Sequence, residues 1–204
     1  MVAEPPGGRT DAIVARTVQA AAGALRDAGY RVEEVTPPRF EDAISAWGLL
    51  QIVDFMSVRD QLVPFMGKDA AYFFATATSS APTLDAAAMS RMYANRLGIA
   101  RAWSQFMADY QIILSPAWCA VPFEVGFDVA SAENVIAALG MIRAFVPANL
   151  IGLPSACVPA GRDPETGVPI GVLLTGRRLH DGECLDAAEA IEARLGVKTP
   201  IDPI

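Results

Sequence analysis

The sequence predicts an α/β fold formed by one unit that spans residues 1–204. Apolar residues recur with helical spacing in several long segments, and short continuous apolar runs, typical of buried strands, lie between them. Gly and Pro residues separate the two kinds of segment, and neither an internal repeat nor a low-complexity linker divides the chain. A length of 204 residues suits one ordinary domain.

The first elements form a helix–glycine–strand unit. Thr10 or Asp11 is placed to cap a helix by accepting a hydrogen bond from a free backbone N–H, and the apolar face of this helix extends to Ala28. Gly29 can adopt the left-handed conformation that ends many helices. A short strand is then expected at 30–35, before two consecutive prolines.

The middle of the chain is predicted to be mostly helical. Helical apolar spacing covers 40–62 and 83–110, whereas the residues at 68–82 show no regular pattern. A short buried strand is expected at 111–114, and it is followed by an ordered loop at 117–128.

The C-terminal part carries the strongest pattern, that of two apolar strands followed by a helix. The expected elements are a helix at 133–145, a loop at 147–154, strands at 155–159 and 168–174 joined by a hairpin-like loop at 161–167, and a helix at 181–195 capped by Asp181 and closed by Gly196.

The composition is rich in apolar residues and poor in charge. Hydrophobic residues make up 52% of the chain and charged residues 19%, and the mean hydropathy is +0.31. The longest apolar region, 135–158, is interrupted by Arg143, Pro147, Asn149 and Pro154, so no membrane span is expected. No signal peptide is recognised, and we expect a cytoplasmic protein. The apolar surplus must be buried in a large core or against something outside this sequence.

Charge and cysteine content exclude several classes of partner. The net charge is −7, and the only lysines are Lys68 and Lys198, so a nucleic-acid surface is not expected. Cys119, Cys157 and Cys184 are widely spaced among small or apolar neighbours, which indicates reduced, buried thiols. No metal site or cofactor is expected, because no CxxC motif and only one histidine are present.

The residues alone identify no catalytic group. His180, between a strand and a helix, is interpreted as a surface loop residue and not as the base of a triad. The acidic pairs at 33–34 and 41–42 are interpreted as solvated charge. Ser79 and Ser80 lack the tight glycine turn that would expose backbone donors, and Cys157 is interpreted as a core residue.

The C-terminal motifs resemble a known family. The stretch PANLIGLPSACVPAG at 147–161, with GVPIGVLLTG at 167–176, resembles the C-terminal region of the amidase signature family, and DYQIILSP at 109–116 resembles a strand of that family. The resemblance covers nearly the whole chain. It implies an α/β fold with a mixed sheet flanked by helices, and a structural role for six Gly and Pro residues: Pro147, Gly152, Pro154, Gly161, Pro169 and Gly171.

The same resemblance implies amide C–N hydrolysis by a Ser–Ser–Lys triad in full-length relatives. The family carries this triad in a Gly- and Ser-rich segment of its N-terminal half, and this sequence has no such segment. No catalytic residue is therefore assigned here. If the family's pocket persists, its wall would include Trp118, Cys119, Phe123 and Asn149, although Trp118 and Phe123 could equally pack the core.

Several hypotheses about the function remain open at this point. The chain is a truncated C-terminal portion that is inactive alone, or a non-catalytic subunit that pairs in trans with a triad-bearing half, or a binding module that has kept only the fold. A weaker alternative is an unrelated hydrolase that uses Ser79 or Cys119. A small amide would be the substrate only after complementation. We also expect self-association, because a half-enzyme would expose the face that its other half covers.

Overall fold

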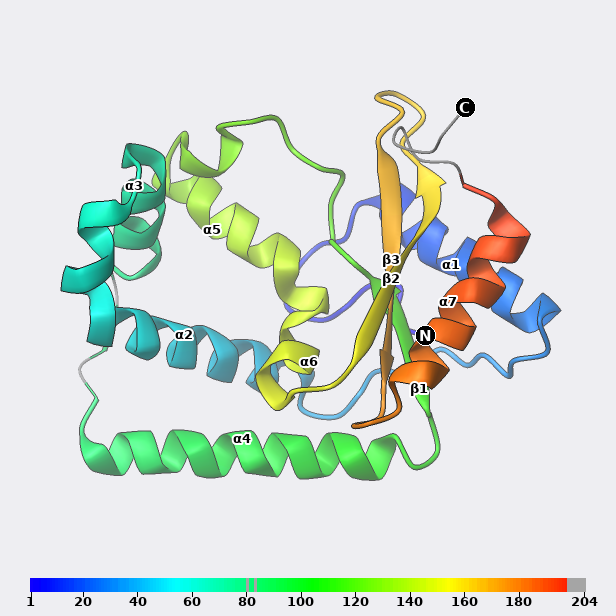
Figure 1. The fold of residues 1–204 in the computed structure, drawn as a ribbon, viewed down its shortest axis with the longest axis horizontal. Helices are drawn as coiled ribbons and strands as arrows, with labels where there is room; N and C mark the ends of the chain where they lie inside the picture. The colour runs from blue at the N-terminus through cyan, green and yellow to red at the C-terminus, as the bar shows by residue number, and fades with distance from the viewer. Residues whose placement is uncertain (80, 83, 198–204) are drawn as a thin grey trace.

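Helices gather around a three-stranded sheet in the computed structural model, which describes residues 1–79, 81–82 and 84–197 (Figure 1). The strands are β1 (Ile112–Pro116), β2 (Ser155–Arg162) and β3 (Pro169–Gly176). Their order is β1-β3-β2, and β3 pairs antiparallel with both neighbours. The α/β class predicted from the sequence, with a sheet flanked by helices, is confirmed.

Two helices cover one face of the sheet. They are α1 (Ala12–Asp27) and α7 (Asp181–Leu195), which lie together to the right of the sheet in Figure 1. Their apolar residues recur at helical spacing and meet the inward-facing residues of all three strands. The resulting core contains Val18, Ala21, Ala22, Leu25, Leu114, Val158, Val172, Leu174 and Ile191.

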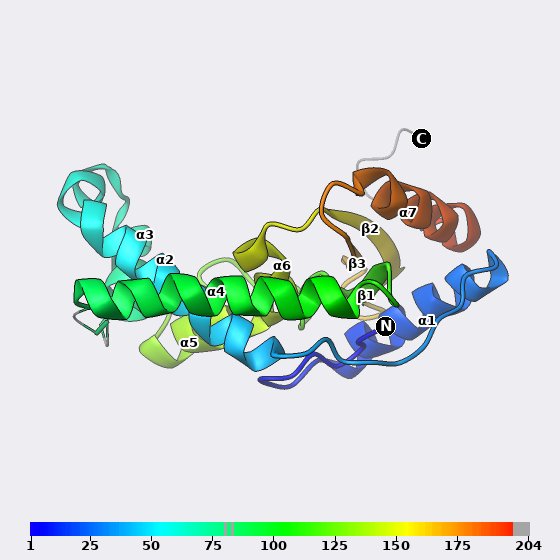
Figure 2. The same cartoon turned by 90° about the horizontal axis from the view of Figure 1, so that it is seen from below.

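A second core lies on the other side of the sheet. It is formed by α2 (Phe40–Leu62), α4 (Ala86–Phe106) and α6 (Val146–Ile151), whose arrangement is visible from below in Figure 2. The rings of Phe40 and Trp103 lie 5.9 Å apart. Ile113 of β1 belongs to the same core, so the strand joins this helical layer to the sheet.

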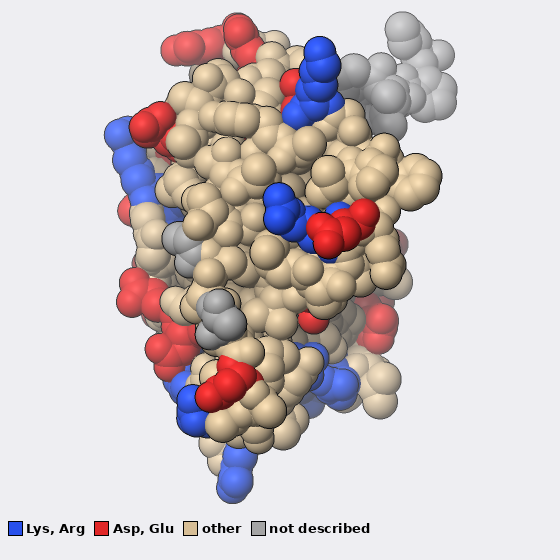
Figure 3. All heavy atoms as spheres, turned by 90° about the vertical axis from the view of Figure 1, so that its left-hand side faces the viewer, with Lys and Arg blue, Asp and Glu red and all other residues tan. Residues whose placement is uncertain are grey.

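The helical layer extends well beyond the sheet. There α2 continues into η1 (Val63–Phe65) and α3 (Lys68–Ala77), next to α5 (Ala132–Met141). The rings of Phe55 and Phe74 stack at 4.4 Å, but Phe65 is 89% exposed. Figure 3 shows uncharged side chains between scattered Lys, Arg, Asp and Glu side chains at this end of the molecule. Part of the apolar surplus is therefore on the surface.

The predicted strand at 30–35 is wrong. Residues 31–37 have no regular secondary structure. The first residues of the chain take the position beside β1, where the Val2 N–H donates to the Leu114 carbonyl at 2.8 Å. Val35 is attached to this lead-in through its N–H, which donates to the Met1 carbonyl at 3.1 Å. The segment is thus held by the lead-in and not by a strand of the sheet.

Two segments expected to be irregular are helical. Residues 68–77 form α3, which follows Gly67 at the N-cap position. The expected loop at 147–154 contains α6, because Pro147 lies in the first turn, where its missing N–H has no helical acceptor. The expected helix at 133–145 ends earlier and continues as η3 (Ile142–Ala144).

Smaller boundary differences also occur. Strand β2 extends to Arg162, so the expected hairpin loop at 161–167 is shorter than predicted. His180, and not Asp181, occupies the N-cap position of α7, while Gly196 ends this helix in the left-handed conformation, as expected. In α4 the cap is Asp85, whose carboxylate accepts from the Ala88 N–H at 2.6 Å.

At two glycines of the C-terminal motifs, the backbone conformation or the packing requires the absence of a side chain. Gly152 ends α6 with φ +69°, a conformation that L side chains rarely adopt. A Cβ on Gly171 would lie 3.1 Å from the Cys157 sulfur and 3.4 Å from the Ala117 Cβ, so its absence lets β2 and the chain after β1 approach closely.

A helix that crosses a bilayer must be both long and apolar. Within residues 1–79, 81–82 and 84–197, no helix combines these two properties.

Candidate functional site

The loop that follows β1 carries an aromatic cluster, defined here as Trp118, Phe123 and Phe127. The ring of Phe123 lies 6.2 Å from that of Trp118 and 4.9 Å from that of Phe127. All three side chains are half-buried. The Trp118 indole N–H is shielded from solvent and has no hydrogen-bond acceptor among the described residues. The cluster therefore presents a largely apolar surface next to the end of β1.

Asp11 fixes the start of this loop to α1. Its backbone N–H donates to the Cys119 carbonyl at 2.9 Å, and its carboxylate accepts from the Val121 N–H at 3.0 Å. Asp11 occupies the N-cap position of α1, but its side chain makes no capping hydrogen bond. The predicted capping role of this carboxylate is thus wrong, because the loop at 117–128 supplies its donor.

Arg143 holds the N-terminal lead-in against η3. This side chain is only 3% exposed. Its guanidinium donates to four acceptors, which are the carbonyls of Pro5 (3.1 Å), Gly8 (3.0 Å) and Gly140 (3.0 Å) and the hydroxyl of Thr10 (2.8 Å). None of the four is a carboxylate. In the sequence, Arg143 stands out only as a charged residue inside an apolar region. A charged residue in such a region must form hydrogen bonds when it is buried, and this was the one indication of its role.

Cys119 is a buried residue of the same loop and is poorly suited to be a nucleophile. It is 1% exposed, and its N–H donates to the Met141 carbonyl at 2.9 Å. Burial raises the pKa of the Cys119 thiol, and the nearby charge of Arg143 opposes this effect only in part. A thiolate, the reactive form, is therefore disfavoured. Ser79, the other candidate nucleophile, is an exposed turn residue after α3, and Ser80 lies outside the described residues.

Asn149 is exposed on α6 and is oriented by α2. Its side-chain oxygen accepts from the Trp47 indole N–H at 2.7 Å. The structure thus places Trp118 and Phe123 near each other and buries Cys119 in the same loop, whereas the side chain of Asn149 is hydrogen-bonded to α2. The two parts of the candidate pocket wall are therefore held by different elements. Asp11 holds the loop that carries the aromatic cluster, and α2 holds Asn149.

Cys157 was expected in the core, and this expectation is wrong. Its side chain is exposed on β2, whereas Cys119 and Cys184 are buried. The strand alternates, so Val158 faces the core between α1 and α7 and Cys157 faces the opposite side of the sheet. Ser155, on the same face as Cys157, shares a 2.9 Å hydrogen bond with Thr175 of β3.

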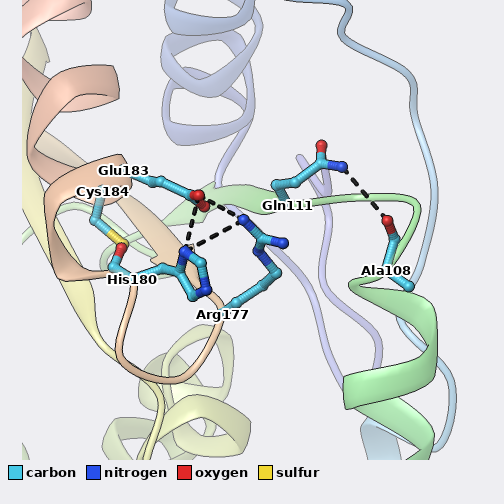
Figure 4. Close-up of polar contacts among 6 residues, drawn as sticks. All are labelled: Ala108, Gln111, Arg177, His180, Glu183 and Cys184. Carbon is cyan, nitrogen blue, oxygen red and sulfur yellow. Dashed lines mark hydrogen bonds and ion pairs between the residues drawn. The ribbon is translucent and has the colours of Figure 1, made fainter.

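His180 belongs to a polar cluster at the start of α7 (Figure 4). Its Nδ1 lies 2.9 Å from a carboxylate oxygen of Glu183, which also forms an ion pair with Arg177. The hydrogen bond from Arg177 holds the pKa of Glu183 below its ordinary value, although burial opposes it. His180 is 44% exposed, so its position agrees with a surface role and not with that of a catalytic base.

Two hollows lie near these elements. One, of about 420 Å³, is bounded by the 30–37 segment, β1 and α7, and includes Glu33, Asp109, Glu183 and Asp186 among its lining residues. The other, of about 430 Å³, lies between α3 and residues 125–129 and is lined partly by Phe73 and Phe74. In the described part of the chain, no group of three or more His, Cys, Asp or Glu side chains is arranged to hold a metal ion.

Comparisons with known proteins agree on one family. The family model for amidases matches residues 1–185. The chain is 33% identical over 189 residues to an indoleacetamide hydrolase from Bradyrhizobium diazoefficiens, a match that covers 92% of this chain and 36% of that protein. It is 38% identical over 95 residues to a glutamyl-tRNA(Gln) amidotransferase subunit from Nitrobacter hamburgensis, covering 47% of this chain and 19% of that one.

Solved structures share the fold. A 6-aminohexanoate cyclic dimer hydrolase matches with a TM-score of 0.79 at 18% identity, over 94% of this chain and 44% of its own. A fatty acid amide hydrolase matches with a TM-score of 0.75 at 18% identity, over 96% and 39%. The chain spans about a third of the length of the indoleacetamide hydrolase that it matches. The matched family model, which covers most of the residues, shows that this chain belongs to the amidase family.

Proposed function

We propose that this chain forms a substrate-pocket wall of an amide C–N hydrolase whose Ser–Ser–Lys triad lies on other polypeptide sequence. The observation that carries the proposal is the family match, which extends over residues 1–185. The described candidates do not assemble a competing catalytic centre, because Cys119 is buried with a raised pKa and no serine or cysteine is hydrogen-bonded to the imidazole of the exposed His180 among the described contacts. Lys198 lies outside the described residues.

In the proposed reaction, the triad serine attacks the amide carbon and the C–N bond breaks. The nitrogen leaves as ammonia or an amine after taking a proton from the triad, and water then hydrolyses the acyl ester. This chain would bind the acyl part of the substrate. The wall consists of Trp118, Phe123 and Asn149, whereas Cys119, the fourth expected member, is buried and packs within the loop. The hydrogen bonds of Asp11 keep the first part of the wall in place.

We further propose an aryl-substituted acetamide as the substrate class. The aromatic cluster supports this choice, because flat aromatic groups pack well against half-buried rings. The two indoleacetamide hydrolases among the relatives, at 33% and 31% identity over 92% of the chain, also favour it. The matches to amidotransferase subunits make glutamine the competing amide, but most of them cover less than half of this chain.

Ammonia release tests the proposal. A joined polypeptide would carry the triad-bearing half of the Bradyrhizobium diazoefficiens indoleacetamide hydrolase, followed by this whole chain. We expect it to hydrolyse indole-3-acetamide faster than glutamine, and we expect the chain alone to hydrolyse neither. A matched control joins the same half to this chain with Trp118→Ala. Turnover by the purified chain alone, or equal rates with and without Trp118, would contradict the proposal.

A further inference from the structure

We infer that Trp47 is a positioning residue of the proposed pocket wall, and that it makes Asn149 present a hydrogen-bond donor to the carbonyl oxygen of the amide substrate. The inference rests on the proposed function for the place of Asn149 in the wall. Its own evidence is the contact between the two side chains and the way in which α6 is held.

The contact with Trp47 decides which end of the Asn149 carboxamide is free. The indole Nε1 of Trp47 lies 2.7 Å from the side-chain oxygen of Asn149. An indole N–H can only donate, so the atom that it contacts must be the carboxamide oxygen and not the nitrogen. Within the described part of the chain, the NH2 group has no hydrogen-bonded acceptor. The free end of this side chain is therefore a hydrogen-bond donor.

Asn149 is the one exposed residue of α6. The other five residues of this helix are buried, and they are Val146, Pro147, Ala148, Leu150 and Ile151. The helix therefore belongs to the core, and the only side chain that it exposes is a carboxamide with a free NH2 group. Such a donor binds an oxygen acceptor, for example a carbonyl oxygen, and does not bind a cation.

Side chains from two distant elements hold the C-terminal end of α6. Arg96 of α4 donates from its Nε to the Leu150 carbonyl at 2.6 Å. Arg178, which follows β3, donates to the Ile151 carbonyl at 2.6 Å. Carbonyls in the last turn of a helix have no acceptor role within the helix, so these two arginines supply the missing donors. The backbone of α6 is thus fixed without the help of Trp47, whose hydrogen bond reaches only the exposed side chain.

The proposed reaction gives an oriented donor its role. When the serine attacks the amide carbon, negative charge develops on the carbonyl oxygen, and a donor that is already oriented stabilises this charge without reorganisation. Every amide substrate carries this oxygen, whereas only an aryl-substituted amide has a ring for the aromatic cluster. Asn149 should therefore act on acetamide and on indole-3-acetamide alike, in contrast to Trp118.

Steady-state kinetics of the joined polypeptide described above test the donor. Asn149→Asp has nearly the same shape and keeps an oxygen for the Trp47 N–H, but it replaces the free donor with an acceptor. It should lower kcat/KM for both amides by about tenfold or more, mainly through kcat, while the melting temperature stays close to that of the parent. An unchanged kcat/KM, or a loss for only one of the two amides, would overturn the inference.

A second variant tests the positioning role of Trp47. Trp47→Phe removes the indole N–H and keeps an aromatic side chain. We expect kcat/KM for both amides to fall roughly three- to tenfold, which is the effect of one hydrogen bond. In an Asn149→Ala background the same substitution should have no further effect, because Trp47 acts only through this carboxamide. An equal effect in both backgrounds would leave Trp47 a structural role alone and overturn the inference.

Trp103 provides the matched control. It belongs to the core against which Trp47 packs, and its indole N–H is buried without a hydrogen-bond acceptor among the described residues. Trp103→Phe therefore makes the same change of side chain without removing a hydrogen bond, and it should keep the kinetic constants of the parent. A loss of kcat/KM equal to that of Trp47→Phe would attribute both effects to packing and overturn the inference.

A measurement on the isolated chain requires no activity. The indole hydrogen of Trp47, followed by NMR, should exchange slowly in the parent and at least about threefold faster in Asn149→Ala, because a hydrogen-bonded N–H exchanges only after local opening. Equal exchange in the two proteins would show that no hydrogen bond orients Asn149, and it would overturn the inference whatever the joined polypeptide hydrolyses.

The outcomes separate this inference from the proposed function. Hydrolysis that Asn149→Asp leaves unchanged supports the function and overturns the inference. If the joined parent hydrolyses neither amide, the function is contradicted, and binding of indole-3-acetamide then decides the inference. A shifted NMR signal of the Asn149 NH2 group on addition of this amide would support the presented donor, and an unchanged signal would overturn it.

Discussion

Replacing Arg143 by methionine should destabilise the chain by about 3 kcal/mol. The residue is 3% exposed and donates hydrogen bonds to three carbonyls and one hydroxyl. Methionine has a similar length but no donor, so Pro5, Gly8, Gly140 and Thr10 would lose their partner in a place that water reaches poorly. The lead-in would then lose its attachment to η3.

The magnitude follows from two opposing effects. Hydrogen bonds to a charged group contribute about 1.5 kcal/mol or more each, so four of them contribute roughly 6 kcal/mol. Burying a guanidinium without a carboxylate costs several kcal/mol, and methionine would recover about half of the gross contribution. In a chain of this size, a net loss of about 3 kcal/mol lowers the melting temperature by roughly 6 to 12 °C.

Urea denaturation followed by circular dichroism measures this change. Arg143→Lys is the control, since a single ammonium keeps the charge but cannot reach acceptors on both the lead-in and α5. We expect this variant to lie between the parent and Arg143→Met. A methionine variant within about 0.5 kcal/mol of the parent would refute the argument that these hydrogen bonds hold the lead-in in place.

Three single contacts give further predictions. A Cβ on Gly176 would clash with the Cys184 sulfur, so Gly176→Ala should destabilise by roughly 1 to 3 kcal/mol, and Cys184→Ala should relieve most of this in a double-mutant cycle followed by thermal melting. A polar thiol reagent should modify Cys157 before Cys119 and Cys184, which should react only after unfolding, as peptide mass spectrometry would detect. Because partial burial raises the pKa of the Cys157 thiol, its modification should speed up at alkaline pH; reaction of Cys119 ahead of Cys157 would be inconsistent with its burial. The pKa of Glu183 is lowered in the fold, so its contribution to stability is present above its ordinary pKa and is lost as the pH falls through the folded value. In Glu183→Gln, the free energy of unfolding should therefore decrease less than in the parent as the pH falls below about 5. The same pH dependence in both proteins would show that the ion pair with Arg177 does not stabilise the fold.

Sequence patterns predicted the elements whose apolar residues face a core. The strands at 111–114, 155–159 and 168–174 were found because their runs are apolar and end at Gly or Pro. In the structure each strand ends two or three residues later than expected, and β1 and β3 also begin one residue later. The segment at 30–35 was wrongly expected to be a strand because a polar stretch that contains two valines is also typical of an edge strand. Its place beside β1 depends on the lead-in, which local sequence does not reveal.

Less of the candidate site than of the fold could be predicted from the sequence. Trp118 and Phe123 were singled out, and the structure adds Phe127 to them. The supports of this loop were missed, because Asp11 is 110 residues away from the amide that it binds. Arg143 was noticed only as an interruption of an apolar region. Contacts over such separations depend on the assembled fold, so no short motif indicates them.

The most direct test of the central claim compares kcat/KM for two amides in the joined polypeptide. Indole-3-acetamide probes the aromatic cluster, and acetamide serves as the reference that lacks an aromatic group. If this chain forms the acyl-binding wall, Trp118→Ala should lower kcat/KM for indole-3-acetamide by roughly tenfold or more and leave acetamide hydrolysis nearly unchanged. An equal effect on both amides, or none on either, would contradict the account.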